Sequence, residues 1–109
     1  MPRSEKHYAE AAEVYHRLAG LTPDNAAPHS QAATSALFEG NVELFNEHVS
    51  RLLEIDPNHN TGLKLLATAK FRIGEYPEAA KLYARVLEAN PEEVESALAL
   101  GMCFHKLKD

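Results

Sequence analysis

The chain has 109 residues, of which 45% are hydrophobic and 25% charged, the balance of one ordinary folded domain. Its formal net charge is -5 at neutral pH, and its sequence pI is about 5.6. These values argue against nucleic acid as the main partner and against a basic helix on a membrane surface, because both need clustered Lys and Arg. No apolar run approaches the roughly 18–20 residues of a membrane span, so no membrane insertion is expected.

The N-terminal residues are charged and lack the apolar core of a signal peptide. Cys103 is the single cysteine, which excludes a disulfide within the chain. Both features favour the cytoplasm as the location of the protein.

Apolar residues recur at three- and four-residue spacing along most of the chain, which is typical of amphipathic helices. Six helices are predicted, at residues 4–19, 26–39, 42–54, 60–73, 77–89 and 92–107. Asn25 and Asn41 are expected to cap the starts of the second and third helices. Gly20, Gly40 and Gly74 are expected to end the first, second and fourth helices.

The last two helices have their own start signals. Pro77 suits the first turn of the fifth helix, where its missing N–H costs nothing. Glu92, Glu93 and Glu95 complement the positive N-terminal end of the sixth helix.

Pro23, Pro57 and Pro91 lie 34 residues apart, and the residues between them repeat with the same period. The sets that match include Ala33, Ala67 and Gly101; Ala11, Phe45 and Ala79; Tyr15, Val49 and Tyr83; and Leu18, Leu52 and Val86. A 34-residue period is the signature of stacked helix–turn–helix units. The sequence therefore predicts an array of helix pairs.

The segment 63–91 resembles a tetratricopeptide repeat, with matching residues at Leu63, Leu66, Ala67, Gly74, Tyr76, Ala79, Tyr83, Val86 and Pro91. The segment 25–57 resembles a weaker copy, in which His29 replaces the usual large apolar residue. The resemblance implies an all-α fold, a right-handed solenoid of six helices in antiparallel pairs. It implies one domain over residues 1–109. The second helix of a repeat lies at 4–23, whole repeats at 26–59 and 60–93, and the first helix of a repeat at 94–109.

This resemblance implies a protein–protein interaction module or scaffold, in which the first helix of each repeat lines a concave groove for a peptide or partner helix. The family's groove positions correspond here to Thr34, Leu37, Phe38, Lys64, Thr68, Phe71, Arg72, Met102 and His105, with Leu98 beside them. Apolar anchors mixed with the Lys and Arg of residues 60–73 suit an acidic or amphipathic peptide. The alternative is that these cations are merely solvated.

One subtype of the family holds the acidic C-terminal tails of heat-shock chaperones with Lys and Asn at set groove positions. Lys64 could supply one such lysine, but Thr68 stands where the asparagine would be. We therefore do not expect a chaperone-tail adaptor.

No residue pattern indicates catalysis, a metal site or a cofactor. The six histidines are His7, His16, His29, His48, His59 and His105. None forms a four-residue pair with another, so we interpret them as scattered surface or groove residues. Cys103 has no neighbouring base to activate it, and phosphate-binding and nucleophile motifs are missing from the sequence, so no enzymatic activity is expected.

The predicted array starts with a second helix and ends with a first helix. The last helix has an apolar face with no following helix to cover it, formed by Ala97, Leu100, Phe104 and Leu107. Large exposed apolar patches mark an interface or a truncation. Two alternatives to the groove therefore stay open, namely self-assembly into a homo-oligomer through the terminal helices, and a regulatory fragment of a larger protein.

Overall fold

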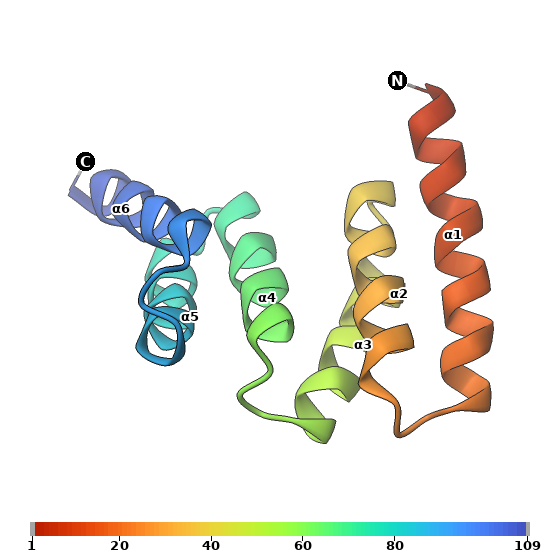
Figure 1. Cartoon of the computed structure of the whole chain (residues 1–109). Coiled ribbons are helices and arrows are strands. Elements are labelled where there is room, and N and C mark those ends of the chain that lie inside the picture. Colours follow the sequence, from red (N-terminus) through yellow and green to blue (C-terminus); the bar gives the residue numbers. More distant parts are fainter. Residues whose placement is uncertain (1, 109) are drawn as a thin grey trace. The chain divides into compact units, whose positions relative to one another are not determined.

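The computed structural model describes the backbone of residues 2–108 and the side chains of residues 7–108. In this range the chain forms six helices, α1 (Pro2–Leu21), α2 (Ala26–Glu39), α3 (Val42–Ile55), α4 (Asn60–Arg72), α5 (Tyr76–Ala89) and α6 (Val94–Lys108). Helix α2 packs against α1 and α3, and α5 packs against α4 and α6 (Figure 1). The predicted all-α fold of helices packed in pairs is confirmed.

The helices form two compact units, Met1–His59 with α1 to α3 and Asn60–Asp109 with α4 to α6. In each unit the middle helix along the chain contacts both of its neighbours. The division into repeats and the right-handed solenoid stay predictions. Among the described residues, no helix combines the length and the apolar character that crossing a membrane requires.

The predicted helix starts and stops are mostly confirmed. The side chain of Asn25 accepts a hydrogen bond from the backbone N–H of Ala27 at 3.1 Å, and that of Asn41 accepts one from Leu44 at 3.1 Å. Gly40 has a φ of 87° and ends α2 in the left-handed conformation, which costs glycine little. Gly74 has a φ of 83° in the turn after α4, which ends at Arg72, and plays the same role.

The bounds of α1 and α6 differ most from the prediction, by up to two residues, whereas those of α3, α4 and α5 differ by one. Helix α1 continues through Gly20 to Leu21, because the N–H of Thr22 still reaches the carbonyl oxygen of Leu18 at 3.0 Å. A glycine inside a helix costs only about 1 kcal/mol relative to alanine, so the helix tolerates it. Helix α6 begins at Val94 rather than at residue 92. The predicted place of a proline at the start of α5 is confirmed.

The repeated apolar positions form the cores of the two units. Ala33 and Ala67 are both fully buried and let their helices approach closely. The larger repeated residues Val49, Leu52, Tyr83 and Val86 are buried as well. In the second unit, Ala67, Ala79, Ala80, Tyr83 and Cys103 form one cluster, the α4–α6 core, which Phe71, Leu82, Ala99 and Leu100 partly cover.

Candidate functional site

Two cations of α4 have acidic partners within their own unit, namely Lys64, which the sequence placed in a groove, and Lys70. Lys64 Nζ lies 2.9 Å from Glu93 Oε2 and 3.7 Å from Glu95 Oε2. Lys70 Nζ lies 3.5 Å from Glu75 Oε2. Sequence analysis missed these pairs because α4 has no acid of its own, and the partners come from the segments that precede α5 and open α6.

Glu93 connects α4 to the start of α6. The hydrogen bond from Lys64 lowers the pKa of the Glu93 carboxyl below its usual value, and burial opposes this shift only in part. The backbone N–H groups of Glu95 and Ser96 also hydrogen-bond this carboxylate and lower its pKa further. Glu93 thus stabilises the N-terminal end of α6, as expected of an acid at that position.

Two further predicted groove residues of α4 contact α5. The hydroxyl oxygen of Thr68 lies 2.9 Å from the carbonyl oxygen of Lys64 and 3.0 Å from the hydroxyl oxygen of Tyr83. Phe71 packs on the α4–α6 core and meets the ring of Tyr76 edge to face, with the ring centroids 5.2 Å apart. Both side chains therefore serve the packing of their own unit, whatever else they contact.

Helix α6 presents two exposed faces on either side of its buried residues. At about 100° per residue, Leu98, Met102 and His105 share one side, which we call the 98/102 face. Ala97, Phe104 and Leu107 share another side, which we call the 104/107 face. The exposed fractions are 66% for Leu98, 52% for Met102, 59% for Phe104 and 45% for Leu107.

The exposed apolar surface available for self-association is smaller than the sequence predicted. Leu100, which was expected on the uncovered face of the last helix, is partly buried against the α4–α6 core. Cys103 is buried, and burial raises the pKa of its thiol, which disfavours the nucleophilic thiolate.

The predicted groove residues of α2 also have neighbours within their unit. The hydroxyl of Thr34 donates to the carbonyl oxygen of Ser30 at 2.9 Å. Phe38 stacks on Tyr8 of α1, with ring centroids 5.1 Å apart, and remains half exposed, while Leu37 is partly buried.

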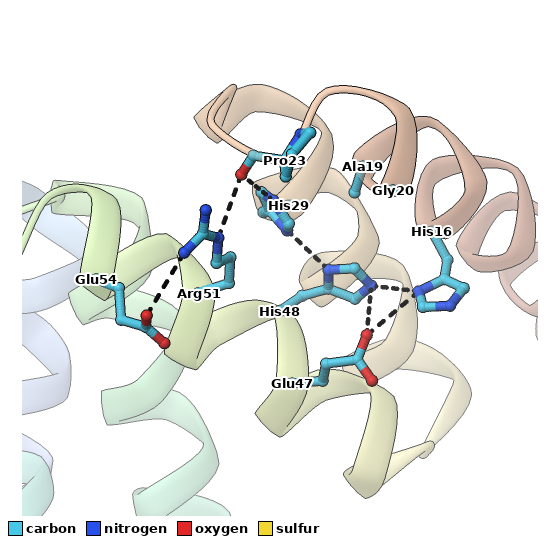
Figure 2. A pocket seen from close by; sticks show the side chains of 9 residues that line it. All are labelled: His16, Ala19, Gly20, Pro23, His29, Glu47, His48, Arg51 and Glu54. Carbon is cyan, nitrogen blue, oxygen red and sulfur yellow. Dashed lines mark hydrogen bonds and ion pairs between the residues drawn. The ribbon is translucent and has the colours of Figure 1, made fainter.

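A pocket in the first unit brings together three of the six histidines (Figure 2). The sequence did not predict this cluster. His16 extends from α1, His29 from α2 and His48 from α3. His16 Nδ1 lies 2.8 Å from His48 Nε2, and His48 Nδ1 lies 3.0 Å from His29 Nδ1. The interpretation of the histidines as scattered is wrong for these three, because helix packing joins residues that are 19 and 32 positions apart in the chain.

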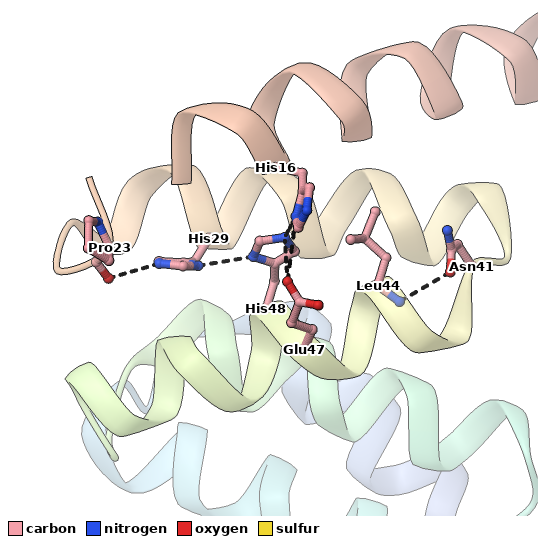
Figure 3. Close-up of polar contacts among 7 residues, drawn as sticks. All are labelled: His16, Pro23, His29, Asn41, Leu44, Glu47 and His48. Atoms are coloured by element: carbon pink, nitrogen blue, oxygen red, sulfur yellow. Dashed lines mark hydrogen bonds and ion pairs between the residues drawn. The ribbon is translucent and has the colours of Figure 1, made fainter. Parts of the chain in front are cut away.

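Hydrogen-bond partners assign the protons along this chain of imidazoles, the histidine relay of His29, His48 and His16 (Figure 3). His29 Nε2 lies 2.9 Å from the carbonyl oxygen of Pro23, which can only accept, so Nε2 bears the proton. In neutral His29 the Nδ1 atom then accepts, and His48 must donate its Nδ1 proton to it. The Nε2 atom of neutral His48 is therefore left as a bare lone pair that faces His16 and Glu47.

The electrostatics keep His48 neutral. Burial lowers its pKa, while the negative charge of Glu47 acts in the opposite direction with a smaller effect. A positive charge on His16 or His29, in the protonated form of either ring, lowers the pKa of His48 further. His48 is buried, whereas the side chains of His16 and Glu47 are about half exposed, so this side of the pocket opens to solvent.

The rest of the pocket combines small residues with ion-paired side chains. Ala19, Gly20 and Pro23 line it with little bulk. Arg51 donates from Nε to the carbonyl oxygen of Pro23 at 3.2 Å and lies 3.5 Å from Glu54 through Nη1. The Arg51 guanidinium thus fixes the turn at Pro23, whose carbonyl oxygen determines which nitrogen of His29 bears the proton.

Two solved structures of tetratricopeptide repeat domains have the same fold. The structure of the first such domain of Spaghetti (RPAP3), bound to the HSP90 peptide SRMEEVD, has a TM-score of 0.87 and 20% sequence identity, and the match covers 95% of this chain and 82% of that one. The Sgt2 domain from Aspergillus fumigatus has a TM-score of 0.82 and 22% identity, covering 94% of this chain and 70% of that one. Both matches show a shared fold.

Sequence comparison points the same way. Residues 64–109 match a family model described as tetratricopeptide repeat. Human tetratricopeptide repeat protein 21A is 29% identical over 106 residues, which cover 97% of this chain. The chain is similar to tetratricopeptide repeat proteins in sequence and in fold. The mouse protein 21A is 29% identical over 89 residues, or 82% of this chain. The matched regions span only 8% of the human protein and 7% of the mouse protein.

The 34-residue period of the sequence provides an internal reference for the pocket. His29 corresponds to Leu63, and His48 corresponds to Leu82. Leu63 is buried, and Leu82 packs on the α4–α6 core. His29 and His48 therefore occupy positions that are apolar in the other unit, and the one signal for the relay in the sequence was the departure at His29.

Proposed function

We propose that this chain is a non-catalytic interaction module that binds an amphipathic peptide or partner helix on the 98/102 face of α6. The observation that supports the proposal is the exposure of Leu98 and Met102 on one side of a helix that contributes Ala99, Leu100 and Cys103 to the core. Apolar side chains exposed in this way gain free energy when a partner covers them, by about 25 cal/mol for each Å² removed from water. A cytoplasmic location is part of the proposal.

The charges beside this face favour an amphipathic partner over a strongly acidic one. An acidic peptide that approached Lys64 would compete with Glu93 and Glu95, which already lie within 4 Å of its ammonium group. An apolar anchor on Leu98 or Met102 displaces no ion pair. Arg72, at the end of α4, is the further cation predicted to contribute to the groove.

The RPAP3 domain supports the general mode of action, because a domain of the same fold holds a peptide in that structure. The chaperone tail itself is not the proposed ligand. In this chain Thr68 takes the place of the clamp asparagine, and its hydroxyl is engaged by Tyr83.

Self-assembly through the 104/107 face is a second candidate function. Phe104 and Leu107 are exposed there, on a different side of α6 from Met102. Leu100 packs inward, which leaves a smaller apolar surface than the sequence predicted. A regulatory role within a longer protein is the remaining alternative, since the matched regions of the protein 21A relatives are a small part of their length.

One pair of variants tests both candidates. Met102→Glu and Phe104→Glu place the same charge at similarly exposed positions of one helix, on its two different faces. Peptides would be selected from a random display library against the unmodified chain, and their affinities measured by fluorescence polarisation. We expect Met102→Glu to weaken binding at least ~10-fold, the loss of one well-packed apolar anchor, while Phe104→Glu binds as the unmodified chain does.

Sedimentation equilibrium of the same three proteins completes the test. A monomer in all three supports the interaction module. A dimer of the unmodified chain that Phe104→Glu abolishes, together with peptides insensitive to Met102→Glu, would overturn the proposal in favour of self-assembly.

A further inference from the structure

The pocket of the first unit contains three groups that commonly ligate metals. One ligand atom each of His16, Glu47 and His48 lies within 4.8 Å of the other two. We propose that these three residues form a binding site for a divalent transition metal ion, with Zn²⁺ as the best fit. Two imidazoles and one carboxylate are a ligand set that Zn²⁺ takes up together with a water molecule.

The distances among the three atoms suit an ion of this size. His16 Nδ1 and His48 Nε2 are 2.8 Å apart, and Glu47 Oε2 lies 3.5 Å from the first and 3.9 Å from the second. The circle through the three atoms has a radius of about 2 Å, which is close to Zn–N and Zn–O distances of about 2.0–2.2 Å. An ion slightly above the plane of the three atoms therefore reaches all of them at bonding distance.

The histidine relay prepares His48 as a ligand. A metal-bound imidazole needs a bare nitrogen toward the ion and a hydrogen bond from its other N–H that fixes the ring. The carbonyl oxygen of Pro23 sets the tautomer of His29, which accepts the Nδ1 proton of His48. The bare Nε2 of His48 then points to the common centre with His16 and Glu47 (Figure 3).

His16 and Glu47 are exposed enough for an ion to reach them from solvent and for their side chains to shift slightly. The side chains of His16 and Glu47 are 47% and 61% exposed, so an ion and its remaining water can approach from solvent. A proton on His16 Nδ1 makes the 2.8 Å contact with His48, and the ion takes its place: this proton leaves to water while Nε2 of His16 takes one up from water, so the ring stays neutral. Tetrahedral geometry needs these two nitrogens about half an ångström farther apart, which the exposed His16 side chain can supply.

The repeat itself argues that these polar groups are present for a ligand. At the corresponding positions of the second unit stand Lys81, Leu82 and Leu63 in place of Glu47, His48 and His29. Leu63 is buried and Leu82 packs on the α4–α6 core, and neither side chain needs a hydrogen-bond partner. Buried imidazoles at the same positions must be desolvated and satisfied, a cost that a bound ion offsets.

Zinc titration of the tag-free, metal-stripped chain tests the site. Calorimetry should give one Zn²⁺ for each chain, and the melting temperature should rise with Zn²⁺. His16→Ala and Glu47→Gln should each weaken Zn²⁺ binding at least ~10-fold, since each removes one of three protein ligands. Two exposed matched controls, His105→Ala on α6 and Glu43→Gln one turn before Glu47, should bind as the unmodified chain does.

Two further measurements separate a built site from loose binding to histidines. Co²⁺ in place of Zn²⁺ should give the visible absorption of a tetrahedral ion, and His16→Ala should remove it. His29→Gln should weaken Zn²⁺ binding about 10–100-fold without changing the stoichiometry, as expected for a residue that orients a ligand. Binding no tighter in the unmodified chain than in His16→Ala, or an equal loss in His105→Ala, would overturn the proposal, with circular dichroism confirming that each variant is folded.

Discussion

The two units solve the same packing problem with different chemistry at equivalent positions. In the second unit Leu63 is buried and Leu82 packs on the α4–α6 core. In the first unit His29 and His48 fill those positions and form a hydrogen-bonded chain that ends on the carbonyl oxygen of Pro23. One helical scaffold thus accepts either solution, provided that every buried polar atom finds a partner.

The main polar contacts of the two units also differ in charge and in burial. The contact of Lys64 with Glu93 in the second unit joins two ionised groups at 2.9 Å, beside the start of α6. The histidine relay of the first unit is buried and neutral at His48, because burial lowers the pKa of that imidazole. The contact in the second unit is sensitive to acid because the Glu93 carboxylate takes up a proton at low pH. The relay in the first unit instead leaves the Nε2 atom of His48 without a proton.

The largest expected effect on stability comes from replacing the buried histidines of the first unit with the leucines of the second. His48→Leu alone leaves the Nδ1 atom of His29 buried without a donor and should lower the free energy of unfolding by about 1–3 kcal/mol. The double variant His29→Leu/His48→Leu, which copies the second unit, should recover most of this loss, because an apolar pair needs no partners.

Urea denaturation with a chelator present would measure this cycle. Losses that simply add in the double variant would contradict the view that the two imidazoles act as one unit.

A smaller effect separates two glycines of the first unit. Gly40 ends α2 at a φ of 87°, so Gly40→Ala should lower the melting temperature, at a cost of about 1 kcal/mol. Gly20 lies inside α1, and nothing stands within 4 Å of an added Cβ. Gly20→Ala should therefore raise stability by about 0.5–1 kcal/mol. Thermal melts of the two variants should move in opposite directions, and shifts of the same sign would show that the end of α1 differs from the structure.

The smallest expected effect is in the pH dependence of the second unit. The folded protein holds the pKa of Glu93 below that of an unfolded glutamate, so its contribution to stability is complete above about pH 4.3 and is lost as the pH falls through the folded pKa. Lys64→Met removes the main cause of this shift and should make the melting temperature fall less steeply in that acidic range. If the melting temperatures of Lys64→Met and the unmodified chain change equally with pH between pH 3 and 6, the ion pair contributes nothing to stability.

Much of the architecture follows from short-range chemistry that the sequence displays directly. The 34-residue period identified the buried small and large positions, because equivalent positions in a repeat meet equivalent neighbours. Asn25 and Asn41 were recognisable as caps because a cap bonds within three residues along the chain. Gly40 and Gly74 were recognisable as stops for the same local reason.

The end of α1 was not recognisable in this way. A glycine permits a helix end without requiring one, and the backbone bond from Thr22 to Leu18 decided that the helix continues through Gly20.

The sequence by itself determined the helices, their caps, the repeat and the apolar core. Only the tertiary structure decided the partners of the polar groups. His16 and His48 are 32 positions apart, and Lys64 and Glu93 are 29 apart, so no local pattern links them. Whether two such side chains meet depends on which helix faces pack together and how far each side chain reaches, and these are properties of the folded unit rather than of any segment.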